Sequence, residues 1–270
     1  MYKSHLTANK EFKTKKEMFS YIKENKELIV KSLKSQVKTK SGHILGFYNP
    51  IDATVKNIPN LDEDYIYPII SNTNWLDNHR DIHLDGSMNK TAKEQQGKVC
   101  YTTDHEIKIN NIVAYPEDVG LMIETLDFNQ LTKDYSGKTE CFMFKIPKSE
   151  LINAPFKRSQ EKGKKMQNSI RMIYIKVDIG FNDNDPDFAQ EKQYYDEAYE
   201  KAVNKDAFKD VNVVTLVREL KIHMEGSAVP FGSNSATPIE SKEAVNDDTS
   251  KIEPSKDTQT ISEMLKKINV

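Results

Sequence analysis

The stretch NSIRMIYIKVDIGF (residues 168–181) decides the fold, because its run of Ile, Val, Tyr and Phe predicts one long β-strand. Alternate side chains of a strand share a face, and one face here carries Ser169, Arg171, Ile173, Ile175, Val177, Ile179 and Phe181. That face is apolar except at its start, where a hydroxyl lies beside one of only four Arg in the chain. Ser169 is therefore either a nucleophile at the rim of a buried face or an ordinary serine.

A second long strand is predicted for VNVVTLVRELKIHME (residues 211–225). One of its faces is largely ionisable and includes Glu219, Lys221, His223 and Glu225. Such a face normally contacts solvent, but it is also a place where a carboxylate could meet a histidine. Between the two strands lies an acidic helical insertion, about residues 182–210, with nine acidic residues against four Lys.

The rest of the central region reads as short strands with few helices. The strands are expected at 43–48, 66–71, 98–103, 108–115, 119–128 and 141–146, and the helices at 87–97 and 148–154. Because strands and helices do not alternate regularly, the pattern predicts an α+β fold, with a mostly antiparallel, β-barrel-like core wrapped by helices.

The ends of the chain differ from this centre. Residues 1–41 form a basic arm with eleven Lys against four Glu in the first 40 positions, and an amphipathic helix is expected at 15–37. This helix either packs on the domain edge or docks on an acidic partner. Residues 42–238 form the central domain, and residues 239–270 are expected to be a flexible linker followed by a short helix.

Composition excludes several classes of protein. The mean hydropathy of −0.69 and the absence of a long apolar run argue against a membrane span, and the N-terminus has no apolar segment typical of a secretory signal. Two cysteines cannot form a disulfide scaffold, so a reducing compartment is expected. A net charge of −2 argues against a direct nucleic-acid role, and we find no nucleotide-binding or zinc-protease motif, so no cofactor is expected.

Two histidine-containing stretches could carry chemistry. His105 follows the strand at 98–103 and is flanked by two acids, as a general base or an ordinary surface histidine could be. In NWLDNHRDIHLDG (74–86), His79 and His83 would share a face if the stretch were helical, and with nearby Asp they could bind a metal. Its Asn, Asp and Gly content favours a polar loop instead. A metal-dependent phosphoesterase is therefore a rival interpretation.

Three segments in this order resemble the prohead maturation proteases of tailed phages. They are DNHRDIHLDGSMNKTAKEQQGKV (77–99) with DHE (104–106), NSIRMIYIKV (168–177), and ELKIHMEGSAVPFGSNSATP (219–238). The last is similar to the closing Glu-Val-Ser motif of that family, with Glu225, Ser227, Val229, Phe231 and Asn234 in register. The chain departs from the family pattern at Arg171, where glycine is common, and at Gly226, where Val is usual.

The resemblance implies a serine endopeptidase related in fold to the herpesvirus assemblins. Ser169 matches the nucleophile of the family and His105 its general base. Glu225 matches the carboxylate that orients the histidine, while Glu219 and His223 remain alternatives for this third role. Arg171 is a candidate donor to the oxyanion.

The resemblance also implies partners and a location. Expected substrates are the scaffold, the major capsid protein and the enzyme itself, inside the assembling prohead in the host cytoplasm. A homo-oligomer is compatible with this role, and no membrane partner is expected. The rival within the same fold is a non-catalytic scaffolding or head protein.

Overall fold

The computed structural model describes residues 1–7, 10–41, 47–48, 62, 64–131, 135–164 and 166–230. The predicted linker, the C-terminal helix and most of the strand expected at 43–48 lie outside these residues. The chain divides into two compact units, one formed by Met1–Ser32 with Ala236–Val270 and the other by Leu33–Ser235.

The described part of the first unit consists of a non-helical N-terminal stretch, bridged between Tyr2 and Phe12, followed by helices. Helix α1 (Lys15–Glu24) begins with a capping box between Thr14 and Glu17 and buries Met18, Phe19 and Ile22. The single helix expected at 15–37 is wrong, because α1 ends at Asn25 and a second helix, α2 (Lys26–Ser35), follows. The Asn25 side-chain amide donates to the Tyr21 carbonyl at 2.8 Å and so satisfies an acceptor at the end of α1.

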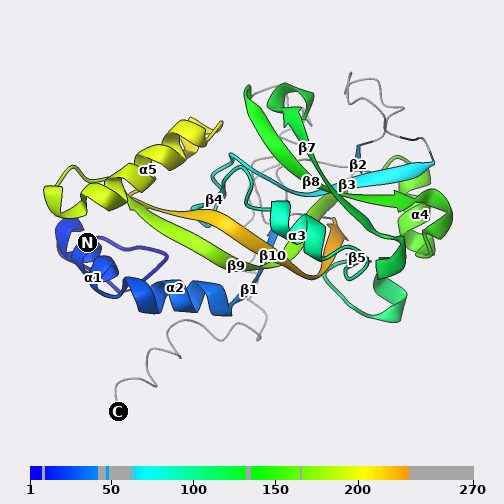
Figure 1. The fold of residues 1–270 in the computed structure, drawn as a ribbon, viewed down its shortest axis with the longest axis horizontal. Helices are drawn as coiled ribbons and strands as arrows, with labels where there is room; N and C mark the ends of the chain where they lie inside the picture. Colours follow the sequence, from blue (N-terminus) through cyan, green and yellow to red (C-terminus); the bar gives the residue numbers. More distant parts are fainter. Residues whose placement is uncertain are drawn as a thin grey trace, which may run out of the picture. The chain divides into compact units, whose positions relative to one another are not determined.

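The second unit is built around the two longest strands. β9 (Gln167–Phe181) and β10 (Val213–Val229) form an antiparallel pair that runs through the centre of Figure 1. Their sheet has the order β1-β9-β10-β5-β6, and β4 also pairs with β10. The other strands are β1 (Val37–Ser41), β4 (Asp81–His83), β5 (Cys100–Thr103) and β6 (Ile112–Ala114). The sheet is mixed, since β4 and β5 run parallel to β10.

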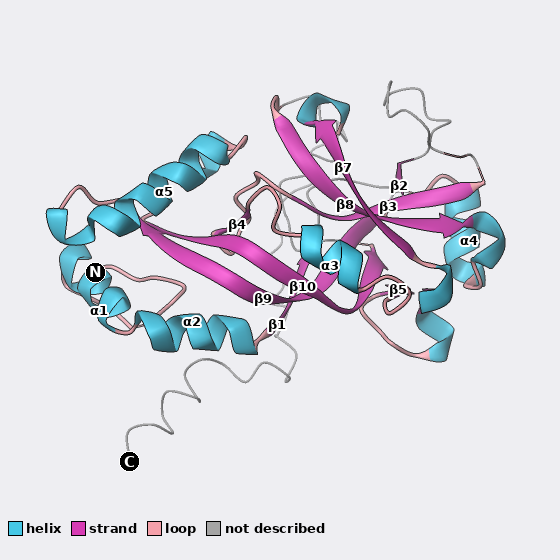
Figure 2. Ribbon diagram, viewed as in Figure 1, coloured by secondary structure: helices cyan, strands magenta, loops and turns pink. Residues whose placement is uncertain are grey.

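A second, antiparallel sheet has the order β2-β3-β8-β7 (Figure 2). Its strands are β2 (Phe47–Tyr48), β3 (Tyr65–Asn72), β8 (Lys138–Pro147) and β7 (Gly120–Asp127). The α+β prediction is confirmed. The barrel-like core is wrong, because the described strands form two open sheets, each of which ends in strands paired on one side.

The two sheets approach closely at Gly226. A Cβ atom on Gly226 would lie 2.7 Å from Cζ of Phe144 in β8 and 3.0 Å from Cγ2 of Ile70 in β3. Tyr101, which pairs with Gly226, meets the Phe144 ring edge-on with centroids 5.8 Å apart. The facing aromatic ring therefore leaves no room for a side chain at position 226.

Short helices surround the sheets. They are α3 (Asn89–Glu94), α4 (Ala154–Glu161), α5 (Ala189–Lys201) and 3₁₀ turns at Ile109–Asn111, Pro116–Asp118, Phe128–Gln130, Lys148–Glu150, Pro186–Phe188 and Lys205–Phe208. The helix expected at 87–97 is shorter in the structure, where α3 begins after Met88 without a side-chain cap. Among the helices described, none has both the length and the apolar character needed to cross a bilayer.

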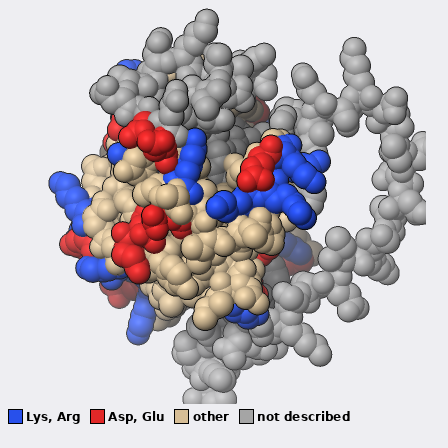
Figure 3. Space-filling view, turned by 90° about the vertical axis from the view of Figure 1, so that its right-hand side faces the viewer, with Lys and Arg blue, Asp and Glu red and all other residues tan. Residues whose placement is uncertain are grey.

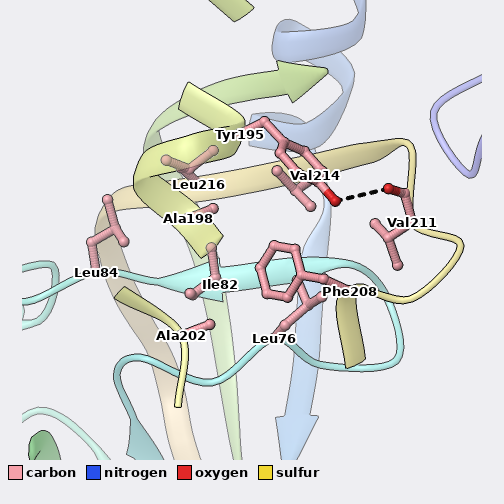
Figure 4. Close-up of a cluster of buried hydrophobic side chains, with 10 residues drawn as sticks. All are labelled: Leu76, Ile82, Leu84, Tyr195, Ala198, Ala202, Phe208, Val211, Val214 and Leu216. Atoms are coloured by element: carbon pink, nitrogen blue, oxygen red, sulfur yellow. Dashed lines mark hydrogen bonds between the residues drawn. The ribbon is translucent and has the colours of Figure 1, made fainter. Parts of the chain in front are cut away.

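The acidic segment 182–210 is part of the core. Helix α5 packs on β9 so closely that a Cβ on Gly180 would lie 2.6 Å from the Tyr195 backbone nitrogen. Arg218 of β10 ties the two elements together through Glu197 of α5 at 2.6 Å and Asp178 of β9 at 2.7 Å. Figure 4 shows the apolar cluster to which α5 contributes, formed by Leu76, Ile82, Leu84, Tyr195, Ala198, Ala202, Phe208, Val211, Val214 and Leu216.

Candidate active site

The candidate base lies on a tight turn after β5. Both central residues of the turn Thr103–Glu106 have positive φ, Asp104 at 54° and His105 at 56°, and the Glu106 N–H donates to the Thr103 carbonyl at 3.1 Å. Positive φ at both central positions is the mark of a type I′ turn; Asp and His adopt it more often than most side chains, although both are more strained there than glycine. Such strain persists only where the surroundings enforce it and is common at functional sites.

Strand β10 enforces this turn. The Asp104 N–H donates to the Ala228 carbonyl at 2.9 Å, and the His105 N–H donates to the Ser227 hydroxyl at 2.9 Å. Ser227 is itself completely buried. These two bonds fix the backbone of His105 against β10, so the position of its ring is determined by the sheet.

The structure brings three of the predicted site residues into one hydrogen-bonded row. His105 Nδ1 lies 2.7 Å from Glu225 Oε1, and His105 Nε2 lies 2.7 Å from the Ser169 hydroxyl oxygen. An ionised carboxylate can only accept, so Nδ1 carries the ring proton and Nε2 of the neutral ring accepts from the Ser169 O–H. This tautomer is the one that lets Nε2 take the proton of a nucleophilic hydroxyl.

Glu225 is fully buried and is held by three donors. Besides His105, the Thr102 hydroxyl donates to Oε2 at 2.9 Å and Arg171 Nε lies 3.1 Å from Oε1. A buried carboxylate without partners costs several kcal/mol, and these contacts offset that cost. Thr102 and Ser227 were not assigned roles from the sequence. The feature that places both residues at the site is the pairing of β5 with β10, in which Thr102 lies opposite Ser227.

Arg171 contacts both the backbone of His105 and the carboxylate of Glu225. Its Nη2 donates to the His105 carbonyl at 2.9 Å, while its Nε faces Glu225. Two of its N–H groups thus brace the turn and the carboxylate, and the expected oxyanion contact stays a prediction. The side chains of His105 and Arg171 are 19% and 27% exposed, whereas Ser169 is 2% exposed, so the row reaches solvent beside the ring and the guanidinium.

A β-bulge places Glu225 in this row. Ile222 pairs with Met172 and Gly226 pairs with Ile170, so four steps along β10 match two along β9. Within the bulge Met224 takes a positive φ of 68° and is 51% exposed. Bulges re-aim side chains next to active sites, and here the extra residues lie opposite Arg171.

The two alternatives for the third member lie elsewhere. Glu219 pairs with Lys90 of α3 at 3.0 Å and its side chain is 30% exposed. His223 precedes the outward-turned Met224 and is half-buried. Both ring nitrogens of His105 are already occupied by Glu225 and Ser169, so neither alternative binds that ring.

The predicted metal pair is not brought together. His79 is exposed in a turn, whereas His83 is fully buried in β4 with its Nδ1 3.2 Å from the Ser71 hydroxyl. In the described ranges no group of three or more His, Cys, Asp and Glu residues is arranged to hold a metal ion. The helical spacing that would have put the two histidines on one face does not occur, because residues 81–83 form a strand.

One thiol lies beside the row. Cys100 is the register partner of Glu225, is 6% exposed and donates to the Met224 carbonyl at 3.5 Å. Burial, followed by the nearby Glu225 carboxylate, raises the pKa of Cys100 to about 11. The thiol therefore stays protonated near neutral pH, so Ser169 is the candidate nucleophile of this cluster.

Comparison of the chain with protein-family models, curated proteins and solved structures finds no match. The resemblance to prohead proteases therefore depends on the three sequence segments, and the chemistry of the site depends on its own geometry.

Proposed function

We propose that this protein is a serine endopeptidase whose catalytic groups are Ser169, His105 and Glu225. The observation that carries the proposal is the pair of 2.7 Å contacts at the two ring nitrogens of His105, which link a hydroxyl to a buried carboxylate through one imidazole. Nucleophile–base and base–carboxylate contacts of this length are the arrangement that activates serine for acyl transfer on many unrelated folds.

The three side chains supply the proton transfers of an acyl-transfer cycle. The Ser169 oxygen attacks the scissile carbonyl carbon while its proton passes to His105 Nε2, and Glu225 stabilises the resulting imidazolium. His105 then gives that proton to the leaving amine as the C–N bond breaks, which leaves an acyl ester on Ser169. A water molecule, deprotonated by the same nitrogen, attacks the ester, and the proton returns to the serine oxygen as the acid product departs.

The biological setting of the proposal comes from the resembled family. The candidate residues follow one another in the chain as His, Ser and Glu, in the same segments that resemble the prohead proteases. We infer processing of scaffold and major capsid protein, together with self-cleavage, inside the prohead in the host cytoplasm. A distant relation in fold to the herpesvirus assemblins belongs to the same proposal, although the strands here form two open sheets.

Among the described residues, the charge on one face of the molecule does not form a basic patch or stripe (Figure 3). Figure 3 shows one face of the molecule, on which Lys and Arg lie beside Asp and Glu around a wide uncharged area. Nucleic-acid binding depends on a basic patch or stripe, and the coloured residues of this face carry both signs of charge.

The direct test is Ser169→Ala, with Ser149→Ala as the matched control because Ser149 is an exposed serine bonded only locally to Glu150. A fluorescent fluorophosphonate should label the wild type and the control at one serine and should not label Ser169→Ala. Co-expression with the capsid protein should yield cleaved product except with Ser169→Ala.

Each contrary result has a definite meaning. A wild-type protein that is neither labelled nor active, but that assembles with capsid proteins, is a non-catalytic scaffolding protein. Cleavage that persists in Ser169→Ala shows that the nucleophile is misassigned. A phosphoesterase activity that is lost when divalent metal is chelated favours the metal-dependent phosphoesterase.

A further inference from the structure

The edge of β9 beside the candidate nucleophile is occupied by the chain's own strand β1. The strands are antiparallel, with Ser41 opposite Ser169 and Thr39 opposite Arg171. Directly opposite residues in such a pair lie about 5 Å apart. The backbone of β1 therefore lies directly beside the residue that would attack a peptide bond.

Extended peptides commonly bind by adding a strand to a sheet edge, where backbone hydrogen bonds give affinity and side-chain pockets give specificity. Among the strands that the structure describes, β1 is the outermost of its sheet on this side and pairs only with β9. A peptide added at this edge would occupy the same position. The pairing of β1 with β9 thus shows how an extended chain can lie against Ser169.

One side chain of β1 is inserted into a built polar pocket. Lys38 Nζ lies 3.0 Å from Asp81 Oδ2 and 4.3 Å from the centre of the Tyr174 ring. The Tyr174 hydroxyl donates to the same Asp81 oxygen at 2.7 Å, and both Asp81 and Tyr174 are buried. A buried carboxylate beside an aromatic face is a recognition site for a cation.

The neighbours of Lys38 are not held in this way. Val37 and Thr39 are both exposed, whereas the Lys38 side chain is only 20% exposed. Lys38 is therefore the side chain of this part of the strand that the protein recognises. It lies three residues before Ser41, which is opposite Ser169.

We propose that β1 occupies the substrate's position on β9, and that Asp81 and Tyr174 form a subsite for a Lys or Arg side chain three residues before the substrate residue opposite Ser169. This inference rests on the proposed peptidase function. It means that the segment at 37–41 acts as a tethered competitor of peptide substrates, and that an extended peptide with a basic side chain at the matching position displaces it best.

The experiment uses the full chain and measures the rate at which a fluorophosphonate labels Ser169. Lys38→Met removes the ammonium group but keeps an unbranched side chain, so β1 should leave β9 more often and labelling should be several-fold faster than in the wild type. The control Lys34→Met changes an exposed lysine of α2 and should label at the wild-type rate. Lys38→Arg keeps a cation in the pocket and should also match the wild type.

Peptide competition tests the pocket itself. The peptide QVKTKS (residues 36–41) should slow the labelling of Lys38→Met, and the same peptide with norleucine in place of Lys38 should not. Asp81→Asn should abolish this difference between the two peptides. Equal competition by both peptides against Lys38→Met, or labelling of folded Lys38→Met at the wild-type rate, overturns the proposal.

A second measurement does not depend on the folding of any variant. Wild-type protein is given a peptide library in which each position is randomised in turn, and the proposal requires selection of Lys or Arg at one position before the cleaved bond. A labelled, active wild type that shows no such selection overturns the subsite alone. A wild type that is not labelled at Ser169 overturns the peptidase, and with it the subsite.

Discussion

Arg171→Met tests whether the guanidinium brace holds the candidate catalytic row together. The substitution removes the 3.1 Å contact to Glu225 and the 2.9 Å bond to the His105 carbonyl, while it keeps a long apolar side chain. A hydrogen bond to a charged group contributes about 1.5–3 kcal/mol. Since the Arg171 side chain is 27% exposed, water replaces part of each contact, and we take about 1.5–3 kcal/mol for the two together.

That free energy corresponds to a fluorophosphonate labelling rate at Ser169 about 10- to 150-fold lower than in the wild type, at about 1.4 kcal/mol per factor of ten. The matched control is Arg218→Met, which removes ion pairs to Glu197 and Asp178 near α5 and should lower the melting temperature without changing the labelling rate of the folded protein. Arg171→Lys keeps the charge but loses the two-pronged geometry and should fall between wild type and Arg171→Met. If Arg171→Met is folded and labels as fast as the wild type, the brace is unnecessary and our account of the site is incorrect.

Two further predictions concern stability and the thiol. Gly226→Ala would place its Cβ 2.7 Å from the Phe144 ring, so we expect a loss of about 1–3 kcal/mol in the free energy of unfolding. Urea denaturation measures this loss, Phe144→Leu should recover part of it, and an unchanged midpoint contradicts the close packing. Cys100, with its pKa raised to about 11 by burial and by Glu225, should resist iodoacetamide at pH 8 in the native protein. Because an unfolded thiol ionises near pH ~8.5, the unfolded state binds fewer protons between about pH 9 and 11, so stability should fall as the pH rises through this window. Rapid alkylation at pH 8 would show that Cys100 is accessible and ionised.

Long elements were predictable from the sequence because their signals are local. The strand expected at 168–181 is β9, which begins one residue earlier, and the acidic helical insertion expected at about 182–210 contains α5. Each combines a sustained periodicity with a clear start and end. The helix expected at 15–37 failed because Asn25 interrupts it while the apolar spacing continues on both sides.

Short strands escaped prediction because their partners define them. β1 and β4 contain five and three residues, and they exist through pairing with β9 and β10. No local pattern in Lys- and Asp-rich stretches indicates such pairing. The barrel-like core failed for a related reason, since strand composition does not say whether a sheet closes on itself.

The candidate site was predictable in its residues but not in its geometry. The sequence resemblance indicated His105, Ser169 and Glu225, and the structure places them in contact. Alternation along β10 could not choose between Glu225, Glu219 and His223, because the bulge opposite Arg171 changes the spacing along the strand. Nor could it show that Arg171 contacts the carboxylate.

The pairing of β9 with β10 divides the candidate machinery between two pieces of chain. The turn that carries His105 is fastened to β10 at Ser227 and Ala228, and β10 also supplies Glu225, whereas Ser169 belongs to β9. A small longitudinal displacement of one strand against the other would separate hydroxyl from imidazole and leave the imidazole–carboxylate pair intact. The contact between hydroxyl and imidazole therefore depends on the register of β9 against β10, whereas the contact between imidazole and carboxylate does not.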